Sequence, residues 1–297
     1  MKDFKPLLAA TAENIEDIRL PVLASVKLDG IRVIAHPERG IVSRKLLQIT
    51  NDYIRNTLQS ELDRLGLSHL DGEIGVGDPT DPDFFQMTTS AVRRKAGEPD
   101  FTYYLFDWWT YPNQNFVTRN SYVQGLIGAS PFIEPVTQRM CETVGELLAF
   151  EEKTLGEGHE GIMTRSLFGP YKFNRSTLKE QILLKRKPFA EDEAIVIGFE
   201  ERMHNANEAT TNELGRTKRS THSANMEPTG TLGALIVQHP VFGEFTIGGG
   251  KGMDDASRRE IWDNKASFLG LPVTFTYQKI GTVNKPRIPQ FKSFRTI

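Results

Sequence analysis

The feature that most constrains the fold of this 297-residue chain is a change in sequence pattern near Pro188. Before it, helical and extended patterns alternate, whereas after it short β-prone runs follow one another between glycine-rich turns. Those later runs are 193–200, 231–239, 243–247 and 272–280, with one helix-like stretch at 254–268. Short strands with a single helix are typical of a small β-barrel. The sequence therefore predicts two domains, 1–189 and 190–297, with a hinge at Lys187-Pro188.

The first of these domains is predicted to mix helices and strands. Two extended runs flank an Asp-Gly turn within 22–35, and further strands are expected at 70–77, 101–109, 132–137, 160–165 and 181–187. Helices are expected at 51–65, 118–128 and 143–156, the first because Leu58, Leu62 and Leu65 recur at helical spacing. In the second domain, the polar segment 203–230 predicts a long loop, which in a compact domain is usually functional or disordered.

Composition excludes several kinds of protein. No apolar run approaches the ~18 residues of a membrane helix, and the N-terminus lacks the apolar core of a secretory signal. The one cysteine, Cys141, cannot form an internal disulfide and rules out a cysteine-rich zinc module. We therefore expect a cytoplasmic protein that does not bind membranes.

Charge alone does not indicate a nucleic-acid binder, because the formal net charge is −2. Phosphate contact depends on local patches, however, and two basic clusters are present. Either cluster could be an ordinary solvated surface. The first spans 165–187 and contains one acid, Glu180, among Arg165, Lys172, Arg175, Lys179, Lys185, Arg186 and Lys187; the second contains Arg216, Lys218 and Arg219.

Lys27 follows a predicted strand and precedes an Asp-Gly turn, in the segment 26–32 (VKLDGIR). Taken alone, it is most simply an ordinary lysine beside a turn. The functional interpretation is a nucleophilic amine, which must lose its proton although a free lysine titrates near ~10.4. Nearby positive charge and desolvation favour that loss. Lys185, Lys187 and a divalent metal are candidates for the positive charge.

Three further segments have both a structural and a chemical interpretation. Asp71-Gly72-Glu73 and Glu160-Gly161 are either turns or ligands for a ribose or Mg²⁺. Period-two geometry places Lys185 and Lys187 on one face of a strand and Arg186 on the other. Two lysines on one face either bind an anion or protect the edge of a sheet from aggregation. Phe106 lies in an aromatic strand that is mostly core, and one face of that strand could stack on a purine, worth ~1–3 kcal/mol.

The order and spacing of these segments are more specific than any one of them. Together they resemble the ordered motif set of covalent nucleotidyltransferases, and most closely that of compact ATP-dependent DNA ligases of viral and bacterial type. The matching segments are 27–32, Ser43-Arg44, Asp71-Gly72-Glu73, 104–107, 160–163 and 184–187. The resemblance implies an α+β fold, in which an adenylation domain of antiparallel sheets with flanking helices precedes an OB-fold β-barrel. ATP is implied rather than NAD, because the NAD-specific N-terminal domain is absent.

By this resemblance, Lys27 is the residue that becomes adenylylated. Val26, Arg32 and the pair Lys185 and Lys187 would bind the nucleotide, with both lysines on the α-phosphate, while Glu73 would hydrogen-bond the ribose and Phe106 would stack on adenine. Glu160 and Glu73 would bind Mg²⁺ or Mn²⁺. Arg32 and Arg44 would hold the 5′-phosphate of a nick, and Arg216, Lys218 and Arg219 of the 203–230 segment would contact DNA. Lys292 and Arg295, in a loose match to the last ligase motif, would orient the departing pyrophosphate.

The function implied by the resemblance is the sealing of nicked double-stranded DNA by a monomer, through lysyl-AMP and adenylylated DNA, in replication, repair or recombination. Three alternatives stay open at this point. An mRNA-capping guanylyltransferase shares the lysine chemistry and the OB domain. An RNA ligase is a closer alternative, although the Asp-Gly after Lys27 favours DNA. A non-catalytic OB-type nucleic-acid binder is disfavoured because every expected catalytic position is filled.

Overall fold

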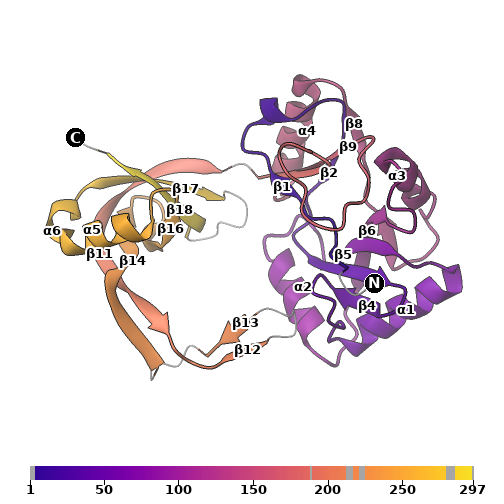
Figure 1. Cartoon of the computed structure of the whole chain (residues 1–297), viewed down its shortest axis with the longest axis horizontal. Coiled ribbons are helices and arrows are strands. Elements are labelled where there is room, and N and C mark those ends of the chain that lie inside the picture. The colour runs from indigo at the N-terminus through magenta and orange to yellow at the C-terminus, as the bar shows by residue number, and fades with distance from the viewer. Residues whose placement is uncertain (1–3, 188, 212–216, 221–224, 279–284, 296–297) are drawn as a thin grey trace. The chain divides into compact units, whose positions relative to one another are not determined.

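The computed structural model describes residues 4–187, 189–211, 217–220, 225–278 and 285–295. They fall into two compact units, the first ending at Lys187 and the second beginning at Phe189 (Figure 1). Strands and helices occur in both units, so the predicted α+β class is confirmed. Within the described residues, no helix is long and apolar enough to cross a membrane.

One five-stranded sheet of the first unit has the order β4-β3-β5-β6-β7 and is antiparallel except between β6 and β7. Its strands are β3 (Ile31–His36), β4 (Gly40–Ser43), β5 (Leu70–Val76), β6 (Phe101–Trp108) and β7 (Ile133–Pro135). Helix α1 (Asp52–Leu65) packs on it through Ile54, Leu58 and Leu62. Asn51 caps this helix by accepting a hydrogen bond from Ile54 N at 2.9 Å, and Gly66, at φ 65°, ends it. The helix predicted at 51–65 is therefore confirmed.

The second five-stranded sheet of this unit has the order β1-β10-β9-β2-β8, in which only β1 and β10 are parallel neighbours. Its strands are β1 (Ala10–Thr11), β2 (Val22–Val26), β8 (Arg139–Cys141), β9 (Ile162–Ser166) and β10 (Leu183–Arg186). Helix α4 (Val144–Gly156) lies beside β8 and the short 3-10 turn η1 (Ile15–Asp17), and helix α3 (Phe116–Gln124) lies beside β6.

Helix α2 (Phe84–Arg93) was not predicted from the sequence, although it lies against β5. Its buried side chains, Phe84, Thr88 and Val92, recur every fourth residue, but a threonine in the middle conceals the apolar stripe. The contact requires a glycine on β5, because a Cβ at Gly75 would lie 2.3 Å from the Phe84 ring. Exposed cations, at 93–95, occupy and follow the end of this helix.

The second unit is built on a six-stranded sheet of order β15-β14-β11-β17-β18-β16. Its end strands, β15 and β16, are separated in the chain only by Gly248, so the chain passes directly from one edge of the sheet to the other. Strand residues Val196, Leu235, Val273 and Phe275 fill its core. The helical stretch predicted at 254–268 is two helices, because Asn264 interrupts it. The elements are β11 (Ala190–Asn205), β14 (Met226–His239), β15 (Gly243–Ile247), β16 (Gly249–Gly250), α5 (Asp255–Asp263), α6 (Lys265–Phe268), β17 (Pro272–Gln278) and β18 (Arg287–Phe294).

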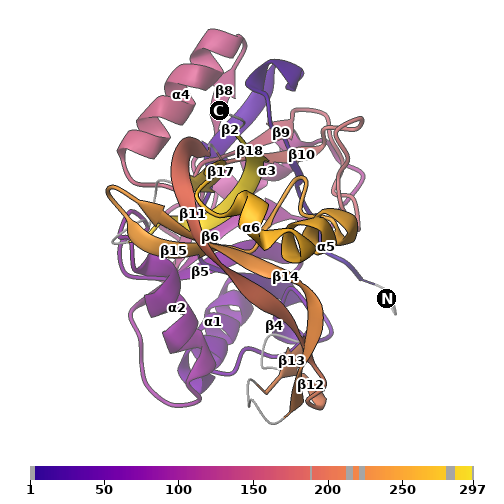
Figure 2. The same ribbon diagram turned by 90° about the vertical axis from the view of Figure 1, so that its left-hand side faces the viewer.

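The prediction of a long loop at 203–230 is wrong for the residues that the structure describes there. Strand β11 continues to Asn205 and pairs with β14 from Met226 onward, and beyond them β12 (Ala209–Thr211) pairs with β13 (Thr217–Arg219). Figure 2 shows this two-stranded ribbon extending away from the six-stranded sheet. A ribbon exposed on both faces has no buried side, so it lacks the apolar alternation by which strands are predicted.

Candidate active site

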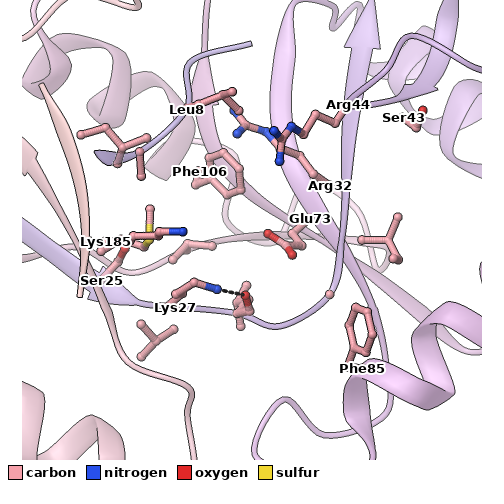
Figure 3. Close-up of a pocket in the computed structure, with 18 of the residues that line it drawn as sticks. Leu8, Ser25, Lys27, Arg32, Ser43, Arg44, Glu73, Phe85, Phe106 and Lys185 are labelled. Carbon is pink, nitrogen blue, oxygen red and sulfur yellow. Dashed lines mark hydrogen bonds between the residues drawn. The ribbon is translucent and has the colours of Figure 1, made fainter. Parts of the chain in front are cut away.

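A cavity of about 640 Å³ lies in the first unit, and residues of both sheets line it (Figure 3). Among the described lining residues, basic side chains outnumber acidic ones eight to one, and Glu73 is the acid. A wall of this kind fits a multiply charged anion. The basic residues are Lys27, Arg32, Arg44, Lys45, Arg93, Arg165, Arg175 and Lys185.

Lys27 directly follows β2 and reaches into this cavity. Its backbone N–H donates to Gly161 O at 2.8 Å, which ties the end of β2 to the start of β9. Its ammonium group forms an ion pair with Glu160 and donates to Leu28 O at 3.4 Å. The Lys27 side chain is 17% exposed and that of Glu160 only 4%, so water screens this ion pair weakly.

Glu160 is shared by two lysines, since one carboxylate oxygen pairs with Lys27 and the other with Lys187. The glycine after it is required by the backbone. Gly161 has φ 155°, and a Cβ there would lie 2.2 Å from Arg186 O. Only glycine therefore lets this segment approach β10 closely enough for Glu160 to reach both ammonium groups.

Strand β10 sends alternate side chains to opposite sides, as its spacing predicts. Lys185 lines the cavity on the same side as Lys27 in Figure 3, whereas Arg186 pairs with Glu151 of α4 at 2.8 Å. Burial, followed by the positive charges of Lys27, Arg175 and Arg44, lowers the pKa of Lys185. The same crowding of cations favours an anion or a neutral amine in this part of the cavity.

Glu73 points into the cavity from β5. Burial of its carboxyl raises its pKa to about 7, although the charges of Lys27 and Arg32 oppose the shift. Near neutral pH this group can therefore donate or accept a hydrogen bond. The close approach of the Asp29-Gly30 turn to β5 requires the glycine, because a Cβ at Gly30 would lie 2.3 Å from Ile74 O.

Phe106 faces the cavity because side chains alternate along β6, where Phe101, Tyr103 and Leu105 are buried in the core. Two guanidinium groups lie against its ring, that of Arg32 at 5.4 Å and that of Arg165 at 5.7 Å from the centroid. These cation–π contacts hold the ring in place beside the open cavity.

Asp71 holds Arg32 in place. Arg32 Nε donates to Asp71 Oδ1 at 2.8 Å and Nη2 donates to Oδ2 and to Leu7 O, the latter at 2.7 Å. Burial lowers the pKa of Arg32, but the carboxylate of Asp71 outweighs it and the net shift is upward. Because Asp71 is fully buried and both its oxygens are engaged, its interpretation as a ribose or Mg²⁺ ligand is wrong.

Two family models match the chain. The ATP dependent DNA ligase domain matches residues 6–187, and the DNA ligase OB-like domain matches residues 225–295. This chain belongs to the ATP-dependent DNA ligase family. The resemblance inferred from the ordered motifs is thereby confirmed, and ATP is the nucleotide named by the family.

Known ligases match the chain to different extents. The DNA ligase of Thermococcus fumicolans is 27% identical over 221 residues, which cover 67% of this chain and 39% of the relative. The chain thus spans about two fifths of the length of that curated ligase. The crystal structure of Chlorella virus DNA ligase-adenylate is 34% identical, covers 99% of each chain and has a TM-score of 0.56. A Lig E DNA ligase structure, at 23% identity and a TM-score of 0.69 over 97% of this chain and 98% of that one, shows the shared fold.

The cavity brings together most residues singled out from the sequence. Val26, Lys27, Arg32, Arg44, Glu73, Phe106 and Lys185 line it, while Glu160 and Lys187 connect to it through Lys27. Sequence reasoning did not assign Met163 and Arg165 to the site and placed Arg165 only in a basic cluster, although period-two spacing puts both on one face of β9. It also missed Phe85, Thr89 and Arg93, because it missed helix α2.

The remaining predicted site residues lie elsewhere. In the second unit, Lys292 pairs with Glu191, and Arg295 pairs with Glu193 at 2.7 Å. Arg219, in β13, donates to Asn207 O. Lys218 pairs with Thr210 through its backbone, and its side chain lies outside the described part of the chain. Arg216 also lies outside the described residues.

Proposed function

We propose that this chain is an ATP-dependent DNA ligase that seals 5′-phosphate/3′-hydroxyl nicks in duplex DNA through a lysyl-AMP intermediate and adenylylated DNA. The observation that carries the proposal is the position of Lys27, whose amine lies in a cavity of basic side chains between Lys185 and Glu73. Membership of the ligase family supports the choice of ATP.

In the first step, the Lys27 amine attacks the α-phosphate, an N–P bond forms, and the bond to pyrophosphate breaks. The ion pair with Glu160 favours protonated Lys27, but Lys187 shares that carboxylate and the charge of Lys185 opposes protonation. The pentavalent phosphorus carries developing negative charge, which Lys185 and Arg32 stabilise from fixed positions.

The other cavity residues bind the nucleotide in this proposal. Phe106 stacks on adenine and Glu73 hydrogen-bonds a ribose hydroxyl, for which its pKa of about 7 allows either role. Val26 lies beside the bound nucleotide, and Lys187 joins Lys185 at the α-phosphate once it leaves Glu160. Arg32 and Arg44 then hold the 5′-phosphate of the nick, which accepts AMP before the 3′-hydroxyl displaces it.

Glu73 and Glu160 are the residues proposed to hold Mg²⁺ or Mn²⁺. The described part of the chain contains no cluster of three acidic, histidine or cysteine ligands. Mg²⁺ commonly takes one or two carboxylates and completes its shell with phosphate oxygens and water, so the two acids fit. When bound, the ion neutralises phosphate charge. Glu160 becomes more available when Lys27 loses its charge as a phosphoramidate, because one of its two ion pairs then disappears.

DNA and the second domain complete the proposal. We assign 1–189 as the adenylation domain and 190–297 as the OB domain, with Lys292 and Arg295 orienting pyrophosphate. Lys218 and Arg219 of the ribbon, together with Arg216, contact nicked duplex, mainly at phosphates, so binding weakens as salt rises. Reversing the charges of Lys218 and Arg219 should weaken nicked-DNA binding and spare self-adenylylation; unchanged affinity would remove the ribbon from the interface. The cytoplasmic location and the monomeric state stay predictions.

Covalent labelling tests the central claim. The full chain is incubated with ATP labelled at the α-phosphate and Mg²⁺, and then with a nicked duplex. The wild type should become labelled and seal the nick, whereas Lys27→Ala should do neither. Label from GTP in preference to ATP would indicate a capping guanylyltransferase, sealing of nicked RNA alone would indicate an RNA ligase, and a labelled Lys27→Ala protein would refute the assignment.

A further inference from the structure

Tyr171 is a buried residue of the first unit that has no part in the proposed chemistry. It lies between β9 and β10 in the chain, the residue is 2% exposed, and its backbone N–H donates to Pro112 O at 2.7 Å. Its ring packs against Trp109 and Phe173. Because Tyr171 is not among the residues that line the cavity, any influence it has on a bound nucleotide passes through other side chains.

The hydroxyl of Tyr171 connects it to Arg32. It donates to Asp71 Oδ2 at 2.6 Å, and the same carboxylate accepts both hydrogen bonds that orient Arg32. Asp71 is fully buried, so water does not replace a partner that is removed. A desolvated ion pair keeps its geometry only where further hydrogen bonds satisfy the carboxylate. The Tyr171 hydroxyl is that further bond.

The ring of Tyr171 connects it to Arg165. The Arg119 guanidinium lies 6.0 Å from the centroid of this ring and donates from Nε to Asp107 Oδ1 at 2.8 Å. Arg165 Nη1 donates to the other oxygen of Asp107. Asp71 and Asp107 are themselves cross-strand neighbours on β5 and β6. One tyrosine therefore contacts both buried Arg–Asp groups.

The two buried Arg–Asp groups each place a guanidinium against the same aromatic ring, Phe106. Arg32 and Arg165 line the cavity, and each guanidinium lies against Phe106. We propose that Tyr171 is a positioning residue that, through Asp71 and Arg119, holds Arg32 and Arg165 against Phe106 and so sets the affinity of the cavity for ATP. This inference rests on the proposed function, because it takes ATP as the ligand of the cavity.

The test is the ATP dependence of Lys27 labelling in Tyr171→Phe, which removes one oxygen and keeps the ring. The KM for ATP should rise about tenfold, the usual effect of one hydrogen bond to a charged group, while kcat per active site changes less than about twofold. A purely structural defect would lower the amount of active protein and leave KM unchanged, so the split between the two constants separates the explanations.

Tyr103→Phe is the matched control. Tyr103 is also fully buried in the same unit, but its hydroxyl donates to a backbone carbonyl, Val33 O, at 3.2 Å. Its KM for ATP should equal that of the wild type. An equal rise in both variants would mean general loosening and would overturn the inference.

Arg119→Lys is the second variant, for use if Tyr171→Phe does not fold. It keeps the charge but loses the planar fork that binds Asp107, so the KM for ATP should rise there too. An unchanged KM in the folded variant overturns the inference while wild-type labelling stands. Failure of the wild type to label would instead refute the proposed function.

Discussion

The salt-bridge group around Asp107 offers a direct test of how the first unit is held together. Asp107 is fully buried and accepts hydrogen bonds from Arg119 Nε at 2.8 Å, from Trp108 N at 2.9 Å and from Arg165. Asp107→Asn keeps the shape but removes the charge. Arg119 and Arg165, whose side chains are 0% and 6% exposed, are then left buried without an anion.

The expected cost follows from that burial. Removing one partner of a buried ion pair costs about 3–5 kcal/mol. The amide oxygen of asparagine still accepts a hydrogen bond, so we expect this substitution to cost about 3 kcal/mol. For a unit of this size, Tm falls roughly 2–4 °C per kcal/mol, so the first unit should melt roughly 6–12 °C lower. Burial lowers the pKa of Arg165 and Asp107 opposes this, so the substitution also removes the main support of its positive charge.

Calorimetry of the full chain measures the effect. Glu157→Gln is the matched control, because the Lys153–Glu157 pair spans 3.7 Å with side chains 66% and 50% exposed and should contribute at most ~0.5 kcal/mol. The Asp107→Asn deficit should persist at about 1 M salt, where screening removes exposed pairs but not buried ones. A Tm within about 2 °C of wild type would show that the two arginines find other partners and that the reasoning is wrong.

Three further predictions concern single residues. Burial raises the pKa of Glu73 from 4.5 to about 7, so the stability that its protonated form contributes is fully present below pH 4.5 and is lost as pH rises through 7. Between pH 4.5 and pH 7 the Tm of Glu73→Gln should therefore fall less than the Tm of the wild type. Parallel profiles of Tm against pH would contradict this. Gly161→Ala should reduce lysyl-AMP formation at least tenfold, because the new Cβ would lie 2.2 Å from Arg186 O. The rate of labelling measures this effect. Gly156→Ala is the control, because a Cβ there meets nothing within 4 Å. Arg258→Met should destabilise the second unit alone, since Arg258 donates to the carbonyls of Leu232, Gly233, Gly248 and Met253; proteolysis confined to that unit would support this, and an unchanged cleavage pattern would refute it.

Parts of the fold with a buried side could be predicted from the sequence. The α1 helix shows leucines at helical spacing and a cap at each end, and five of the eight residues of β6 are aromatic. The outer ends of β11 and β14 and the β12–β13 ribbon could not, because both their faces are exposed and their pairing depends on backbone hydrogen bonds that all residues share. Helix α2 was missed because its buried stripe includes Thr88.

The residues of the candidate site also fall into those that the sequence predicted and those that it did not. Lys27, Glu73, Phe106 and Lys185 could be located because their segments have a recognisable order, and the structure brings their side chains to one cavity. The supporting residues could not. Tyr171 is 100 positions from Asp71, and Arg119 is 50 positions from Gly169, whose carbonyl it binds at 3.1 Å. Nothing in the local sequence distinguishes such contacts from ordinary core or surface positions.

The alternation along β6 has a consequence for how this protein can change. Tyr103 and Leu105 fill the core while Phe106 faces the cavity, so one strand serves both. Inserting or deleting a single residue there would exchange the two faces, moving the aromatic ring inward and core side chains into the cavity. Variation in this strand is therefore restricted to substitution at constant length. Changes in length belong at its ends, where the chain leaves the sheet before Phe101 or after Trp108.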